Sequence, residues 1–283
     1  MAESSRIAYY FFRKRFAVVG LAVVALLTFV AIFAPQIAPN DPFAVSRNRF
    51  LPPGSEGFLL GTDHLGRCVL SGLLYGARVS LFVGLSAAAT ATVIGIFIGS
   101  ISGYFGGWID AVLMRTTELF MTIPRFVLAL IVVAFFGTGL NRLILVIGIL
   151  SWPGTARLVR SEFLSQRNLA YVDSGRVVGM SSLRIMFVEI LPNILPPVIV
   201  VATLDIATAI LLEASLGFFG LGDPNLRSWG AMLSQAQAHM RRAWWMSVFP
   251  GISIATTVLG FNLIGEGLNE ATNPRMQIEG SET

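Results

Sequence analysis

Hydrophobic positions gather into six long runs along the chain, and shorter polar stretches separate these runs. Several of them exceed the roughly 18 predominantly apolar residues that mark a membrane-spanning helix. We therefore predict six spans, at about residues 16–38, 77–103, 109–137, 140–163, 194–216 and 245–267. Because a bilayer offers no water to satisfy backbone polar groups, the predicted fold class is an all-α polytopic membrane protein.

Composition agrees with a chain embedded in lipid. Charged residues make up only 13% of the 283 residues, whereas soluble domains carry roughly 25%. The net charge of +4 comes from arginines dispersed among loops and helix ends, which is typical of membrane topology rather than of nucleic-acid binding. The single cysteine, Cys68, excludes an intramolecular disulfide and a cysteine-based zinc site. The two histidines, His64 and His239, are far apart in sequence, so no HExxH-type metal motif is present.

Basic residues at the N-terminus set the predicted orientation. Arg6, Arg13, Lys14 and Arg15 precede the first run, and such residues favour the cytoplasmic side of a membrane. That run is too long for the signal-peptide core of about 7–15 residues, so we expect it to be retained as the first span. An even number of spans then returns the C-terminus to the cytoplasm.

Two features of the runs indicate how the helices pack. Small residues recur at steps of four in the second run, namely Ala91, Gly95, Gly99 and Gly103. This ladder favours close helix contact, either within the chain or with a second subunit. Pro124 lies within the third run and predicts a kink there.

Two carboxylates, Asp205 and Glu213, lie within the fifth run, where a charged group is costly in hydrocarbon. Their spacing is about two helical turns, so we expect them on one face of the helix. Two interpretations stay open: structural pairing with neighbouring helices, or lining of a water-accessible pathway.

A polar stretch, NLAYVDSGRVVGMSSLRIMFVEILPN at residues 168–193, separates the fourth and fifth runs. Asn168 is a suitable N-cap for a first short helix, and Gly179 suits the left-handed residue that ends one. Ser181 or Ser182 can cap a second helix that leads into the fifth span. A connection between helices needs only a few residues, so this insert predicts a docking site, on the cytoplasmic side by the parity of the spans.

Two further polar segments are predicted on the opposite side. Residues 39–76 contain NDPF, LPPGSEG and GTDHLGR, a composition typical of an ordered loop with little regular structure. Residues 222–244 contain a predicted short helix from about Trp229 to Met240.

The insert resembles the Glu-Ala-Ala loop of bacterial ABC importer permeases. Here Asp173-Ser174-Gly175 stands in place of that trio, followed by Gly179 and by Ile190-Leu191-Pro192-Asn193. Other stretches are similar to the second permease subunit of the peptide-importer subgroup, in order and over nearly the whole chain: GTDHLGRCVLSGLLYGARVSL (61–81), GYFGGWIDAVLMR (103–115), LEASLGFFGLG (212–222), SWGAML (228–233) and FPGISIATTVLGFNLIGEGLNEATNPR (249–275). Cys68 and Gly72 stand where the family has an aspartate and an arginine.

The resemblance implies a type I ABC importer permease fold with a cytoplasmic coupling helix between spans four and five. It implies a bacterial or archaeal plasma (inner) membrane and a substrate class of di- or oligopeptides. It also implies the partners: a homologous permease that completes a heterodimer, two cytoplasmic ATPases and an extracytoplasmic substrate-binding protein. The chain would divide into an N-terminal part, 1–76, and a permease core, 77–283.

Candidate site residues follow from the resemblance and from the predicted loops. The expected ATPase contacts are Leu169, Tyr171, Val172, Asp173, Ser174, Gly175, Arg176 and Gly179. The expected binding-protein contacts are Asp63, Arg67, Asp223, Arg227 and Trp229. The only lysine, Lys14, lacks the upstream glycines of a P-loop. The chain is therefore not expected to be an enzyme or to bind a cofactor, and ATP and Mg are expected in the partner ATPases.

Two other classes stay open at this point. An ion-coupled secondary transporter would use Asp205 or Glu213 as its titrating carboxylate and would work without ATP, but it leaves the 168–193 insert unexplained. A membrane-embedded hydrolase is disfavoured, because Cys68 lies outside the spans and neither histidine is near a candidate serine at membrane depth.

Overall fold

The protein is built from helices. A computed structural model describes residues 3–272, and within that range the β pairing is limited to two isolated bridges. The helices are α1 (Glu3–Arg13), α2 (Arg15–Ile37), α3 (Val69–Phe105), α4 (Gly107–Thr122), α5 (Arg125–Phe136), α6 (Leu140–Gln166), α7 (Ala170–Val177), α8 (Ser182–Arg184), α9 (Leu191–Phe218), α10 (Trp229–Ala236) and α11 (Trp245–Thr272). A π-helical segment, Ile185–Ile190, joins α8 to α9, and a 3-10 turn, Gln237–His239, follows α10.

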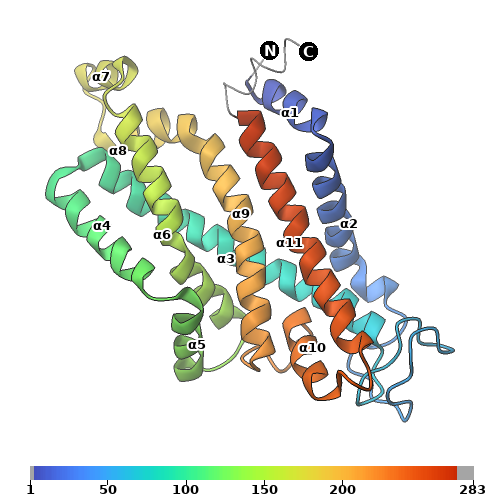
Figure 1. Ribbon diagram of the computed structural model, residues 1–283. Helices are drawn as coiled ribbons and strands as arrows, with labels where there is room; N and C mark the ends of the chain where they lie inside the picture. The colour runs from blue at the N-terminus through green and yellow to red at the C-terminus, as the bar shows by residue number, and fades with distance from the viewer. Residues whose placement is uncertain (1–2, 273–283) are drawn as a thin grey trace.

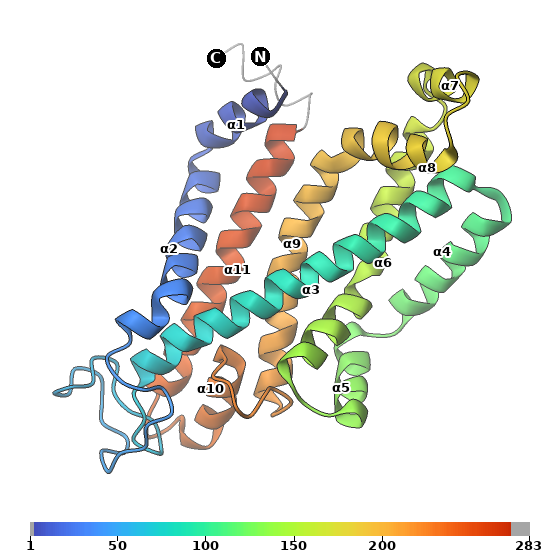
Figure 2. The same cartoon turned by 180° about the vertical axis from the view of Figure 1, so that it is seen from behind.

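The long helices run between two ends of the molecule (Figures 1 and 2). One end carries α1, α7 and the last turns of α11, and we call it the α7 end; the α10 end carries α10 and the loop from α2 to α3. In the described part of the chain, five helices are long and apolar enough to cross a membrane. The bent pair of α4 and α5 supplies a sixth crossing when it is counted as one span. The all-α fold with about six spans is confirmed.

The start of α3 and the presence of α1 differ from the prediction. Helix α3 begins at Val69, so the division of the chain at residue 76 falls inside a helix. Helix α1 is missing from the prediction, because its apolar residues do not form a long run. Instead Ile7, Tyr10 and Phe11 form a stripe that packs at the start of α2 and the end of α11.

The small-residue ladder of α3 packs against α6 of the same chain. A Cβ on Gly95, Gly99 or Gly103 would lie 2.5–2.7 Å from the Cβ of Thr155, Val159 or Phe163 respectively. Contacts this short cannot be accommodated. The helices approach this closely only because the residues of α3 at these positions are glycines, which have no Cβ. Of the two interpretations of the ladder, the structure shows contact within the chain.

The third span is broken at Pro124, as predicted. Helices α4 and α5 are bent by 85° where they meet. Ile123 is extended, with φ −89° and ψ 129°, which is the conformation that a following proline imposes on its neighbour. The proline also removes the N–H that would continue the helix.

Helix α9 connects the three largest buried clusters. Near the α10 end, Ile210 packs with Trp229 and Trp245. Leu216 belongs to a second cluster built from α3, α5 and α6, and Ile194 to a third cluster near the α7 end. A shift of α9 would therefore reach every part of the bundle.

The α3–α6 packing predicts different effects on thermal stability when alanine replaces each of two helical glycines. Replacing Gly99 with alanine should lower the thermal unfolding midpoint of the detergent-solubilised protein, because overpacking costs about 1–3 kcal/mol. In Gly251→Ala, on α11, the added methyl group meets no atom within 4 Å, and alanine favours the helix. That variant should unfold at the wild-type temperature or above it, whereas equal midpoints for the two variants would contradict this account.

Candidate functional site

The segment after α6 folds as the sequence predicts, with one exception. Helix α7 ends in a Schellman motif: Met180 N–H donates to the Gly175 carbonyl and Gly179 N–H to the Arg176 carbonyl, each at 3.0 Å. Gly179 is left-handed, with φ +82°, and Ser181 Oγ accepts from Arg184 N–H at 3.4 Å to cap the next helix. The prediction that Asn168 is the N-cap is wrong. Helix α7 begins at Ala170, so Leu169 is the N-cap residue, and its side chain makes no capping hydrogen bond.

The inner face of α7 is buried. Val172 is fully buried in the third cluster with Phe163, Met186 and Ile194, and Gly175 is buried as well. These two residues, predicted as ATPase contacts, therefore face the bundle and hold α7 onto it. The side chain of Val172 is therefore not available to a partner.

The outer face of the same segment is apolar and exposed. Val177 and Val178 expose 88% and 78% of their surface, and Leu169 and Leu183 are exposed as well. We call these four residues the α7 patch. Sequence reasoning did not single out Val177, Val178 and Leu183, although a valine pair directly before the terminal glycine was an available signal.

The polar residues of α7 tie it to neighbouring helices. Arg176 pairs with Asp173 at 2.9 Å and lies over the ring of Tyr104, at the end of α3, at 5.8 Å. Tyr171 donates to the side chain of Gln166 at the end of α6, at 3.0 Å. Because the Asp173–Arg176 pair is exposed, we assign it little stability. This ion pair lies on the same short helix as Val177 of the α7 patch.

A half-buried ion pair and its hydrogen bonds join α3, α4 and α6. Arg160 donates two hydrogen bonds to Asp110, at 2.5 and 2.6 Å, and Ser102 donates a third at 2.5 Å. Arg167 donates to the carbonyl of Gly103 at 3.1 Å. Two of the helices that pack with Val172 in the third cluster, α3 and α6, are therefore also joined to each other and to α4.

The two carboxylates of the fifth span have different surroundings. Glu213 is 1% exposed; Ser80 of α3 donates to it at 2.9 Å, and Ser228 before α10 also interacts with it. Asp205 is half-buried and accepts from Thr155 of α6 at 3.1 Å. Glu213 is thus enclosed among hydroxyl donors of neighbouring segments, whereas Asp205 is partly exposed and has one hydroxyl donor.

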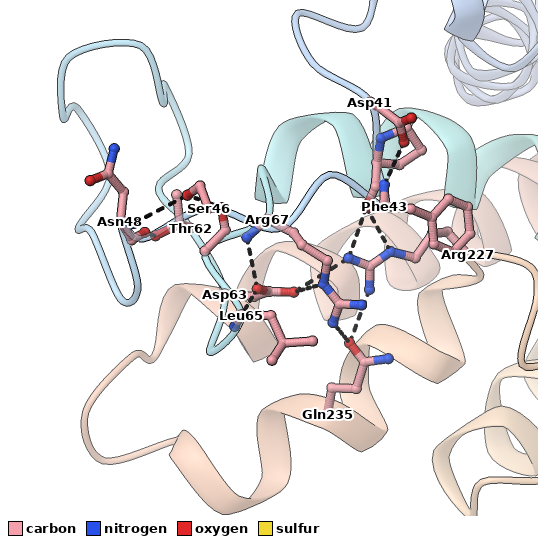
Figure 3. Close-up of polar contacts among 12 residues, drawn as sticks. Asp41, Phe43, Ser46, Asn48, Thr62, Asp63, Leu65, Arg67, Arg227 and Gln235 are labelled. Atoms are coloured by element: carbon pink, nitrogen blue, oxygen red, sulfur yellow. Dashed lines mark hydrogen bonds and ion pairs between the residues drawn. The ribbon is translucent and has the colours of Figure 1, made fainter.

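At the α10 end, Asp63 lies at the centre of a buried polar network (Figure 3). Arg67 donates to it from Nε at 2.6 Å and Arg227 from Nη2 at 3.3 Å. Both guanidinium groups also donate to Gln235 of α10, and Arg227 donates to the carbonyl of Pro42. Burial by itself raises the pKa of Asp63, but the hydrogen bonds and charge of Arg67 outweigh burial and leave this pKa below its usual value.

The five residues predicted to contact the binding protein have partners within the protein itself. Asp63, Arg67 and Arg227 are buried among one another. Trp229 is 1% exposed and donates to the Leu73 carbonyl at 3.1 Å. Asp223 accepts from Leu140 N–H at 3.1 Å and so caps α6. These hydrogen bonds connect the 39–67 loop, α10 and the segment before α10 to one another and to α3 and α6.

The two histidines come together at the α10 end despite their distance in sequence. The rings of His64 and His239 stack at 5.2 Å, and burial lowers the pKa of His64. Within residues 3–272, no three His, Cys, Asp or Glu side chains are grouped closely enough to hold a metal ion.

Comparison with known proteins identifies the family. Residues 95–278 match the model of the family "Binding-protein-dependent transport system inner membrane component". Residues 5–53 match the "N-terminal TM domain of oligopeptide transport permease C". The chain belongs to this family of permeases.

Curated relatives of the permease match over nearly the whole chain. It is 40% identical over 274 residues to the di/tripeptide transport system permease protein DppC of Pseudomonas aeruginosa, covering 94% of this chain and 90% of the relative. It is 43% identical over 276 residues to the dipeptide transport system permease protein DppC of Escherichia coli K12, covering 95% and 92%.

Solved structures show the same fold at low sequence identity. The permease matches an inward-facing structure of the MetNI methionine ABC transporter with a TM-score of 0.60 and 19% identity, over 72% of this chain and 98% of the other. An amino acid ABC transporter with histidines matches at 0.54 and 15%, over 70% and 92%. The fold is that of type I ABC importer permeases. These comparisons support an inner-membrane transport subunit of an ABC importer, whose family implies ATPase and binding-protein partners, and not the ion-coupled alternative.

The network around Asp63 predicts how the stability of the permease depends on pH. Asp63→Asn removes the carboxylate that two buried arginines share, and should destabilise the solubilised permease by about 3 kcal/mol at pH 7. The folded pKa of Asp63 is lowered, so its contribution is present above the unfolded value of about 4 and is lost as pH falls through the folded pKa. The difference between variant and wild type should therefore shrink in thermal unfolding below about pH 4.

Glu56→Gln serves as the control, because Glu56 is exposed in the same loop. It should unfold like the wild type at every pH. Equal unfolding midpoints of Asp63→Asn and wild type at pH 7 would show that the network does not hold the loop.

Proposed function

We propose that this permease forms half of the translocation pathway of an ATP-driven importer for di- or oligopeptides. The observation that carries the substrate class is the 40–43% identity, over 94–95% of the chain, to proteins named for dipeptide or di/tripeptide transport. A homologous second permease would complete a heterodimer. Two ATPase subunits would bind ATP and Mg, and an extracytoplasmic binding protein would deliver the peptide.

The α7 end would face the cytoplasm, with both termini. Arg13, Lys14 and Arg15 support this orientation at the junction of α1 and α2. Lys14 pairs with Glu270 of α11 at 2.6 Å, so the ends of the first and last spans lie together. The 39–67 loop and α10 would then be extracytoplasmic.

The α7 patch would dock on an ATPase subunit. Exposed apolar side chains on a short helix are typical of such a contact, with Tyr171, Asp173, Ser174 and Arg176 at its edge and Gly179 shaping its end. Val172 would transmit movement from α7 to α6 and α9, because it is buried in a cluster that contains residues of both helices. Closure of the ATPases would then shift the bundle between two arrangements that open the pathway to opposite sides.

The binding protein would meet the exposed residues of the external segments. Phe43, Val45 and Leu59 of the loop and Met240 and Trp244 after α10 are exposed at this end. The buried network around Asp63 would keep these residues in a fixed arrangement rather than contact the binding protein itself.

The α7 patch is tested by adding charge to it. The double variant Val177→Asp, Val178→Asp should lower ATP-driven peptide uptake about tenfold in vesicles containing the whole complex, because it would bury two carboxylates in an apolar contact. The ATPase subunits should also co-purify with it poorly. Ser165→Asp, exposed at the end of α6, adds charge outside the patch and should retain both properties. Normal uptake by the double variant would overturn the docking proposal.

A further inference from the structure

Charged side chains on α4 and α6 line one side of the permease. A cavity of about 430 Å³ is bounded by Met114, Glu118, Arg157, Arg160 and Ser161. The side chains of Arg115 and Glu118 are 80% and 62% exposed, and Arg157 is exposed as well. Such groups are costly when they face hydrocarbon. This side of α4 and α6 therefore meets water.

The same side leads to the break in the third span. Arg157 lies next to the break, with Nη1 at 3.6 Å from the Sδ of Met121. Beyond the break, Arg125 is the first residue of α5 and is half-buried. Its Nη2 lies 3.8 Å from the position that a Cβ on Gly154 would occupy. The bend thus turns an arginine toward α6, partway along the bundle.

A carboxylate from α9 lies near this arginine. Asp205 is held by the hydroxyl of the residue after Gly154, Thr155, at 3.1 Å. Arg125 is close enough to act on Asp205 electrostatically, yet no ion pair within 4 Å joins them in the described structure. Both groups therefore keep hydrogen-bonding capacity that a ligand could use.

Two opposite charges held apart by different helices suit a zwitterion. We propose that Arg125 and Asp205 bind the two charged termini of a peptide as it passes through the pathway, Arg125 taking the carboxylate and Asp205 the ammonium group. Arginine offers planar paired donors that match a carboxylate, and the N-terminus of α5 at the same position favours negative charge. Thr155 is a positioning residue for Asp205. This assignment rests on the proposed peptide-import function.

The test uses the complete transporter in lipid vesicles, with its ATPases and a saturating amount of peptide-loaded binding protein. The probe is a labelled dipeptide with neutral side chains and free termini. Arg125→Gln and Asp205→Asn should each lower the maximal uptake rate about tenfold. Binding-protein-stimulated ATP hydrolysis should stay within about twofold of wild type, since assembly and coupling do not need this contact. Arg125→Lys, which keeps the charge but lacks the planar paired donors, should take up the dipeptide faster than Arg125→Gln and more slowly than the wild type.

Arg142→Gln is the matched control, because Arg142 is exposed in the first turn of α6, near the α10 end, and donates only to the Thr138 carbonyl. It should transport like the wild type. Unchanged uptake by Arg125→Gln and Asp205→Asn would overturn the inference. So would a parallel loss of uptake, ATP hydrolysis and thermal stability, because that pattern marks a structural pair.

If Arg125→Gln does not assemble, Asp205→Asn keeps side-chain volume and tests the same contact from the other helix. Failure of the wild-type vesicles to take up the dipeptide in the presence of ATP would instead overturn the proposed peptide import. The two proposals therefore fail in distinguishable ways.

Discussion

The close approach of α3 and α6 positions the polar groups that lie within the bundle. Lipid gives two helices no hydrophobic reason to associate, so backbone proximity through Gly95, Gly99 and Gly103 takes that place. With the two helices fixed together, Ser80 of α3 reaches Glu213, and Thr155 of α6 reaches Asp205. A side chain added on the ladder would clash with α6 and push these two helices apart.

The same pair of helices supports the α7 segment. The Asp110–Arg160 ion pair fixes α4 to α6, and Ser102 brings in α3. Val172 then joins α7 to a cluster that contains residues of α6 and α9. Because protein interiors are close-packed, displacement of α7 cannot be absorbed locally and must shift these helices. Under the proposed docking of an ATPase on the α7 patch, movement of that subunit would reach the bundle by this route.

At both ends of the permease, one set of residues is buried and holds the segment in place, while another set on the same segment is exposed. At the α10 end the Asp63 network fixes the loop while Phe43, Val45 and Leu59 stay exposed. At the α7 end Val172 and Gly175 are buried while Val177 and Val178 are exposed. Several residues of the sequence motifs, such as Asp63 and Gly175, are among the buried residues that hold their segment. A loop keeps one conformation only when its polar groups are satisfied and its turns are tight.

Local physical chemistry made several features readable from the sequence alone. Long apolar runs require helices in lipid, Pro124 removes a backbone donor in mid-span, and Gly179 and Ser181 end and begin helices through their own backbone and side-chain geometry. Other features needed the tertiary structure. The pairing of Asp63 with Arg227 spans 164 residues, and the meeting of Arg125 with Asp205 depends on the direction of a bend and on the rotation of α9. The sequence placed Val172 on a helix, but only the packed bundle determined that it faces inward and that Val177 does not, since which face of a helix is buried depends on what packs against it.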